Sequence, residues 1–151
     1  MKRHETIVPL SHDHYHALLM AQAVKKNFIK TDLGLSSVED KLKYVINAYN
    51  TELIPHFNHE ENILFPLANG KNDELDKLIS EILEEHDRIH EAIAKIKSGD
   101  LEQNLDDFGF LLEAHVRKEE RILFPKIEEV LGDDLNLISG QILAVKDTCG
   151  I

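Results

Sequence analysis

The sequence has one cysteine, no tryptophan and no long apolar run. A lone thiol, Cys149, cannot form an internal disulfide, which excludes a disulfide-stapled fold. No apolar run approaches the roughly 20 residues that a membrane-spanning helix needs. The first residues also lack the apolar core of a signal peptide, so we expect a soluble protein of the reducing cytoplasm.

Positive charge is also scarce. Lys and Arg total 17 against 28 Asp and Glu, which gives a formal net charge of -11. A surface of this sign repels phosphate backbones and anionic lipid headgroups. We therefore expect no nucleic-acid partner and no membrane partner.

What the chain does have is helical periodicity over most of its 151 residues, 42% of which are hydrophobic. This length and composition predict a single domain, with a helical bundle over about residues 10–131 and a C-terminal extension over 132–151. Apolar residues recur at helical spacing over residues 11–28, 37–66, 73–97 and 101–131, and Ser11 is the expected N-cap of the first helix. The predicted fold is all-α, an up-down-up-down antiparallel four-helix bundle, with a short C-terminal helix around residues 135–146. Pro55 predicts a bend one turn before His56.

One motif occurs twice. Residues 56–66 read HFNHEENILFP and residues 115–125 read HVRKEERILFP. Residues four apart lie on one face of a helix, so His56 pairs with Glu60 and His115 pairs with Glu119. Both pairs lie on apolar stripes, and we expect them to point into the core.

Further histidines share this placement. His86 and His90 lie four apart on the apolar stripe of the third predicted helix, and His14 lies on that of the first. Buried imidazoles and carboxylates are costly to desolvate unless a partner compensates them. Five histidines and two glutamates in one core therefore predict bound cations, and this ligand set suits Fe, Zn or Mn.

The number of ligands favours two ions. Seven ligands exceed the roughly six positions of one such ion, whereas two octahedral ions offer about twelve. Five imidazoles, two bridging carboxylates and a shared oxo or hydroxo bridge leave about one position for a small ligand such as dioxygen.

Two assignments keep an alternative. In the stretch HDHYH, His14 shares the face of Ala17 and Ala21, but His12 and His16 can instead be aligned with the HDRIH stretch at 86–90. Glu61 and Glu120 follow the two motif glutamates; we expect solvated charges there, with a hydrogen bond to a ligand imidazole as the alternative.

The stretches DHYHAL, PHFNHEENILFP, EEHDRIHEAI and HVRKEERILFP together resemble the motifs of the hemerythrin-like, or HHE cation-binding, domain family over about residues 10–130. The resemblance implies a four-helix bundle with a carboxylate- and oxo-bridged di-iron site that binds dioxygen or nitric oxide. By motif match it implies six ligands, His14, His56, Glu60, His86, His115 and Glu119. His90 completes the HxxxH pattern of true hemerythrins, which some HHE members lack. True hemerythrins close the fourth helix with HxxxxD, whereas this chain has HxxxE.

The expected function is a metal and small-ligand binding protein rather than an enzyme: a di-iron protein that binds dioxygen or nitric oxide for sensing, storage or scavenging. One alternative is an enzyme-like role in iron–sulfur repair, nitrosative stress or peroxide reduction. The other is a bundle that holds zinc for structure alone.

Overall fold

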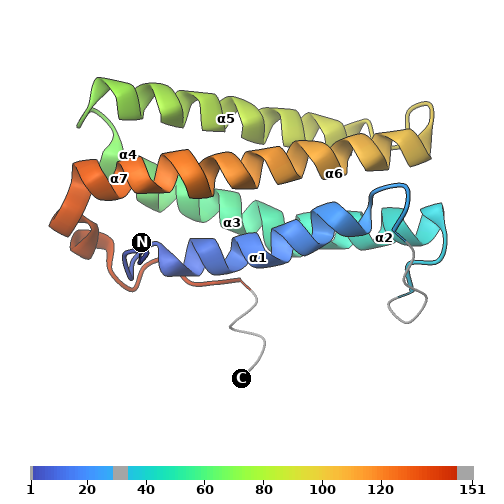
Figure 1. Ribbon diagram of the computed structural model, residues 1–151, viewed down its shortest axis with the longest axis horizontal. Coiled ribbons are helices and arrows are strands. Elements are labelled where there is room, and N and C mark those ends of the chain that lie inside the picture. Colours follow the sequence, from blue (N-terminus) through green and yellow to red (C-terminus); the bar gives the residue numbers. More distant parts are fainter. Residues whose placement is uncertain (1, 29–33, 146–151) are drawn as a thin grey trace.

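Four antiparallel helical rods, packed side by side, make up the protein in the computed structural model, which describes residues 2–28 and 34–145 (Figure 1). The first rod is α1 (Val8–Ala23) and the third is α5 (Asp73–Ala94). The second rod runs through α2 (Val38–Ala48), η2 (Tyr49–Leu53), α3 (Ile54–His59), η3 (Glu60–Leu64) and α4 (Phe65–Ala68). The fourth runs through α6 (Leu101–Lys118), η4 (Glu119–Leu123) and α7 (Phe124–Leu131). The described residues include no β-strand, so the all-α bundle is confirmed.

The first rod begins earlier than the sequence predicted. α1 starts at Val8, with Pro9 in its first turn, and ends at Ala23. The fixed φ of proline suits this first turn, where its missing N–H is not needed. The prediction of Ser11 as N-cap is therefore wrong, and the Ser11 hydroxyl instead donates to the Glu120 carboxylate at 2.8 Å.

Three of the prolines explain the segments η2, η3 and η4, which are single π-helical turns. Pro55, Pro66 and Pro125 each occupy the second residue after such a turn. A proline lacks an N–H and clashes with the carbonyl four residues earlier in a regular α-helix. The wider π turn removes this conflict, so the rods continue past each proline. The distortion predicted before His56 thus takes the form of the π turn Tyr49–Leu53.

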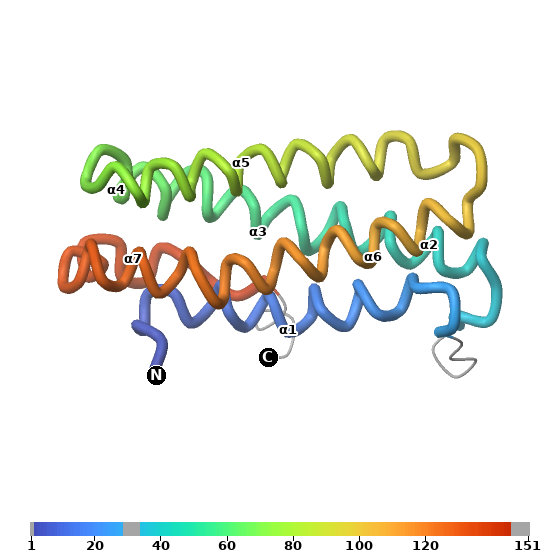
Figure 2. The backbone as a smooth tube through the Cα atoms, turned by 45° about the horizontal axis from the view of Figure 1, so that its top comes forward, coloured from blue at the N-terminus to red at the C-terminus, as the bar shows by residue number. Residues whose placement is uncertain are grey.

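The core consists of two apolar clusters, one toward each end of the bundle. One contains Leu10, Leu64, Ile82 and Leu123, and the other contains Ala17, Leu53, Ile89 and Leu112. Each rod contributes to both clusters, and between the two clusters each rod carries at least one buried histidine: His14, His56, His86 or His115. The tube view shows the rods side by side along their whole length (Figure 2).

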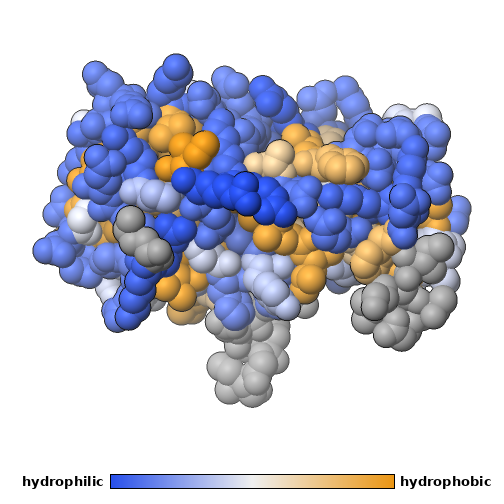
Figure 3. All heavy atoms as spheres, viewed as in Figure 1, coloured by the Kyte–Doolittle hydropathy of each residue, from blue (hydrophilic) through white to orange (hydrophobic). Residues whose placement is uncertain are grey.

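The chain after the bundle folds back along α1. A 3-10 helix, η5 (Gly132–Ile138), overlaps only the start of the short helix predicted around 135–146. Residues 139–145 are not helical, and Gly140 turns the chain there at φ 81°, so most of that prediction is wrong. Ile142 and Ala144 are buried beyond that turn. None of the helices in the described part of the chain is long and apolar enough to cross a membrane. The face in Figure 3 is mostly hydrophilic, with separate apolar patches.

Candidate metal centre

The two copies of the repeated motif place their glutamates at the start of π turns. Glu60 opens η3 and Glu119 opens η4. The carbonyl of each accepts a bond from the N–H five residues later, at Phe65 and Phe124 respectively. The repeated ILFP is therefore the sequence of a π turn followed by its proline, and such turns are frequent at functional sites.

Six polar side chains meet between the two apolar clusters, and we call them the inner cluster. They comprise His14, His56, Glu60, His86, His115 and Glu119. None is more than 3% exposed. They form two overlapping groups, within each of which the ligand atoms lie within 4.8 Å of one another. His14 and His56 belong to the first group, His86 and His115 to the second, and Glu60 and Glu119 to both.

The Nε2 atoms of the four histidines face the two shared carboxylates. His14 Nε2 lies 3.1 Å from Glu119 Oε1, and His86 Nε2 lies 3.1 Å from Glu60 Oε1. The distances from His56 to Glu60 and from His115 to Glu119 are longer, 3.6 and 3.4 Å. Within the part of the chain that the structure describes, six buried atoms of the inner cluster have no hydrogen-bond partner: Nε2 of His56, His86 and His115, both oxygens of Glu60 and Oε2 of Glu119. Such unpartnered polar atoms cost free energy unless a ligand satisfies them, and a cation could do so here for nitrogen and oxygen atoms alike.

On the outer side, each imidazole bonds a second carboxylate through Nδ1. The four contacts run from His14 to Glu120 at 2.6 Å, from His56 to Asp13 at 2.9 Å, from His86 to Glu61 at 2.6 Å and from His115 to Glu85 at 2.7 Å. We call Asp13, Glu61, Glu85 and Glu120 the outer carboxylates. An ionised carboxylate only accepts hydrogen bonds, so each Nδ1 carries the proton. In a neutral imidazole, Nε2 then presents its lone pair to the centre of the bundle.

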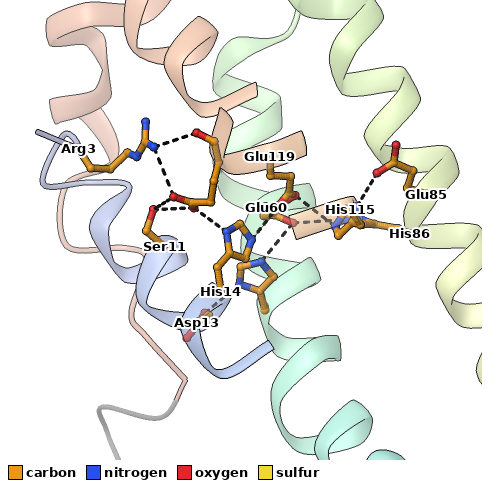
Figure 4. A network of polar contacts seen from close by, with 11 residues as sticks. Arg3, Ser11, Asp13, His14, Glu60, Glu85, His86, His115 and Glu119 are labelled. Atoms are coloured by element: carbon orange, nitrogen blue, oxygen red, sulfur yellow. Dashed lines mark hydrogen bonds and ion pairs between the residues drawn. The ribbon is translucent and has the colours of Figure 1, made fainter. Parts of the chain in front are cut away.

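The outer carboxylates link the rods in a closed ring. Each is adjacent in sequence to an inner-cluster residue, yet it bonds the histidine of the next rod. The first rod supplies Asp13 to the second, the second supplies Glu61 to the third, the third supplies Glu85 to the fourth, and the fourth supplies Glu120 to the first. Figure 4 shows part of this network, with Asp13 and Glu85 among the labelled residues around the inner cluster.

Further contacts hold these carboxylates in turn. Glu120 accepts from Ser11 at 2.8 Å and lies 3.4 Å from the Arg3 guanidinium; Figure 4 labels both Ser11 and Arg3. Arg3 also pairs with Glu128. Glu85 lies 3.3 Å from the ammonium group of Lys118. Burial opposes ionisation of both carboxylates, yet hydrogen bonds from His14 and His115, with smaller effects of Arg3 and Lys118, hold the pKa values of Glu120 and Glu85 below their usual range. Metal-bound imidazoles commonly donate to a carboxylate of this kind.

The charges of the inner cluster are divided unequally when no ion is present. Burial, together with the neighbouring Glu119, raises the pKa of Glu60 well above its usual range. Burial also opposes ionisation of Glu119, but His115 and His14 beside it hold its pKa well below the usual range. Burial alone would lower the pKa of His14, yet Glu119 and Glu120 raise it to about 9. Burial lowers the pKa of His86 to about 4.

Of the seven residues that the sequence predicted as ligands, the structure brings six together. His90, one turn after His86 on α5, is outside both groups, and its Nδ1 contacts the Tyr49 hydroxyl instead. On α1 the geometry favours His14 over the alternative pair. His12 is exposed and His16 is half-buried, their rings lie 5.5 Å apart, and neither belongs to the two groups.

Sequence reasoning missed two of the four outer carboxylates. Asp13 and Glu85 were not singled out, while for Glu61 and Glu120 the bond to an imidazole was the alternative to a solvated charge. The signal that could have found all four is adjacency, because each directly precedes or follows an inner-cluster residue. Adjacency alone does not tell which rod each carboxylate reaches.

Comparison with known families agrees with this geometry. The family model described as Hemerythrin HHE cation binding domain matches residues 2–127, which include the inner cluster and all the outer carboxylates. No curated protein and no solved structure shows significant similarity to the chain.

Proposed function

The chain belongs to the Hemerythrin HHE cation binding domain family, and from this premise we propose that its inner cluster holds two iron ions and binds dioxygen or nitric oxide. The observation that carries the proposal is the pair of buried groups that share Glu60 and Glu119. Two carboxylates common to two sets of imidazoles suit two ions at a bridged separation better than one ion.

The donors fit iron. They are imidazole nitrogens and carboxylate oxygens, a set that suits Fe, Zn or Mn, and the two groups contain no thiolate. Four Nε2 atoms and four carboxylate oxygens would fill eight of the about twelve positions of two octahedral ions. The remainder leaves room for a bridging oxygen atom and for a small ligand. Iron, when bound, supplies the redox chemistry that dioxygen and nitric oxide require.

The chain itself would orient the ligands and keep water away. The outer carboxylates fix the tautomer and the ring orientation of each imidazole. Phe57 stacks on His86 with ring centroids 3.9 Å apart, and Phe124 stacks on His14 at 5.4 Å. Both phenylalanines are buried, and they separate the inner cluster from the two ends of the bundle.

The size of the space beside the site supports a small ligand. A cavity of about 10 Å³ touches His56 and Asp13. This volume is about that of one water molecule, so it admits no organic substrate. The cavity borders the Asp13 side of His56 and neither Glu60 nor Glu119, so an organic substrate cannot reach the inner cluster through it. This favours a diatomic ligand over an enzyme substrate.

The ligand role predicted for His90 stays a prediction. The proposed set is the inner cluster of six, which already supplies two imidazoles to each ion. His90 lies near Phe57 and Tyr49, one helical turn away on α5.

Metal analysis and optical spectroscopy test the proposal. The metal-free chain is loaded with Fe²⁺ under anaerobic conditions, and two iron ions per chain are expected. Exposure to dioxygen should then produce near-ultraviolet and visible absorption that fades when the gas is removed, and nitric oxide should give a distinct spectrum under anaerobic conditions. One iron per chain, or a colourless aerobic protein that retains zinc, would rule the proposal out.

A matched pair of variants locates the ions. His14→Ala removes an inner-cluster imidazole and should lower the iron content to one ion or less per chain. His12→Ala, two residues away on the exposed side of α1, should leave the content at two. If the two variants retain equal iron, His14 is not a ligand.

A further inference from the structure

The C-terminal segment, residues 139–145, lies against the first rod on the side of His56. It follows η5 and runs back beside α1, as the tail in Figure 1 shows. Thr6 donates to the Leu135 carbonyl at 3.1 Å where this part of the chain turns back. Ile142 and Ala144, 3% and 5% exposed, pack it onto the bundle. The segment is therefore held as part of the folded domain up to Val145.

A direct chain of contacts joins this segment to the inner cluster. The main-chain N–H of Val145 donates to Asp13 Oδ1 at 2.7 Å. The other oxygen of the same carboxylate, Oδ2, accepts from His56 Nδ1 at 2.9 Å. Asp13 is only 7% exposed, so both bonds form in a region of low dielectric, where they are strong.

This arrangement differs from the support of two other outer carboxylates, Glu120 and Glu85. Glu120 is held by Arg3 and Ser11, and Glu85 is held by Lys118, in each case through side chains of the region that the family model matches. Asp13 is held by a backbone amide beyond residue 127, where the match ends.

The same segment closes the space behind His56. The cavity of about 10 Å³ lies between Asp13, His56, Leu53 and Val145. A cavity of this size holds at most about one water molecule. With Val145 in place, the bond between Asp13 and His56 has little competition from solvent.

We infer that the C-terminal segment helps to form the metal centre: the Val145 amide positions Asp13 and, through Asp13, the His56 imidazole. Val145 is thus a positioning residue for one of the two ions, the one that His14 and His56 would hold. The effect on iron binding rests on the proposed function. The positioning of His56 does not, because it can be measured in metal-free protein.

Proline at position 145 tests the role of the amide, because it removes the N–H and keeps a side chain of similar size. In Val145→Pro we expect one of the two iron ions to pass to a chelator at least about 10-fold faster than in the wild type, a typical effect of losing an outer hydrogen-bond partner. Val145→Ala keeps the N–H and should match the wild type. A chain shortened to end at Ala144 lacks the same donor and should behave like the proline variant. Equal release of both ions in all four proteins would overturn the inference.

A second measurement needs no metal. In metal-free protein labelled at histidine with ¹⁵N, the Nδ1–H proton of His56 should exchange faster with water in Val145→Pro than in Val145→Ala. The Nδ1–H of His115, which Glu85 holds on the far side of the cluster, should not change. Unchanged exchange at His56 would contradict the positioning role. If the wild-type chain takes up no iron but this difference is found, the proposed function fails and the positioning role stands.

Discussion

At the scale of single residues, the four imidazoles of the inner cluster share one orientation. All four bond an outer carboxylate through Nδ1, which leaves Nε2 directed at Glu60 and Glu119. A shared orientation of this kind has no benefit for packing alone, because an apolar side chain of the same volume would avoid the desolvation cost. The cost is offset once cations bind the Nε2 atoms and the shared carboxylates.

His86 belongs to the inner cluster and His90 does not, although they lie one turn apart on the same helix. The two residues therefore provide a direct test of which histidines bind metal. Replacing His86 by Ala should lower the metal content by at least one ion per chain, since its Nε2 lies 3.1 Å from the shared Glu60. Replacing His90 by Ala removes a side chain outside both groups, and two ions should remain. Metal content per chain after dialysis distinguishes the two.

The same measurement tests the prediction from the sequence that His90 is a metal ligand. If His90→Ala loses an ion as readily as His86→Ala, His90 is a fifth imidazole ligand and moves toward the site when metal binds. Its Nδ1 contact with Tyr49 would then act as an outer hydrogen bond like those of the other four histidines.

At the scale of elements, the π turns relate the sequence repeat to the site. Each of η3 and η4 opens with a shared glutamate and is followed by a buried phenylalanine and a proline. The extra residue in a π turn rotates the chain that follows relative to a regular α-helix. The same turn in the second and fourth rods therefore gives both glutamates an equivalent setting, as expected for two carboxylates that would bind the proposed pair of ions together.

Close contact between α1 and α6 gives a second prediction. Gly109 on α6 faces the first rod, and a Cβ added there would lie 2.5 Å from the backbone carbonyl of Ala21. Gly109→Ala should therefore destabilise the fold by about 1–3 kcal/mol, although alanine favours helices. Urea unfolding of the metal-free protein measures the change. In the control, Ala114→Gly at an exposed position of α6, glycine should cost about 1 kcal/mol. A stabilised Gly109→Ala variant would show that the two helices can separate slightly without loss.

At the scale of the whole molecule, the ring of outer carboxylates ties all four rods together at one level. Each bond joins one rod to the next, so the register of every rod against its neighbour is fixed beside the inner cluster. The apolar clusters on either side fix the distance between the rods. Because the helices that hold it are packed above and below, the site is expected to persist without metal.

The charges of the inner cluster predict how the stability of the metal-free chain depends on pH. Glu119 and Glu120 raise the pKa of His14 to about 9, so the folded chain retains a proton that an unfolded histidine releases near 6.5. The stabilising contribution of His14 is complete below pH 6.5 and is lost as the pH rises toward 9. Glu60 acts in the same direction, because its pKa is also raised. The free energy of unfolding should therefore be smaller at pH 9 than at pH 6.5.

Denaturant unfolding in the presence of a chelator at the two pH values measures this difference. His14→Ala should show a smaller decrease between them, because the group that keeps its proton is gone. A free energy of unfolding that is level or rising from pH 6.5 to 9 in the wild-type metal-free chain would contradict the charge distribution described above.

The sequence by itself determined the bundle and the inner positions of the site. Helical periodicity located the four rods, and apolar neighbours showed that His56, Glu60, His115 and Glu119 face inward, because an i,i+4 pair shares the face of the residues around it. These inferences are local. They depend on helix geometry, which is the same whatever the rods pack against.

Only the tertiary structure decided which side chains meet. It separated His86 from His90 and His14 from His12 and His16, because a shift of a few residues along a rod moves a side chain several ångströms from the centre. It also joined Asp13 to His56 on one side and to the Val145 amide on the other. Contacts between segments far apart in the chain depend on how the rods are placed against one another, and neither periodicity nor motif spacing contains that placement.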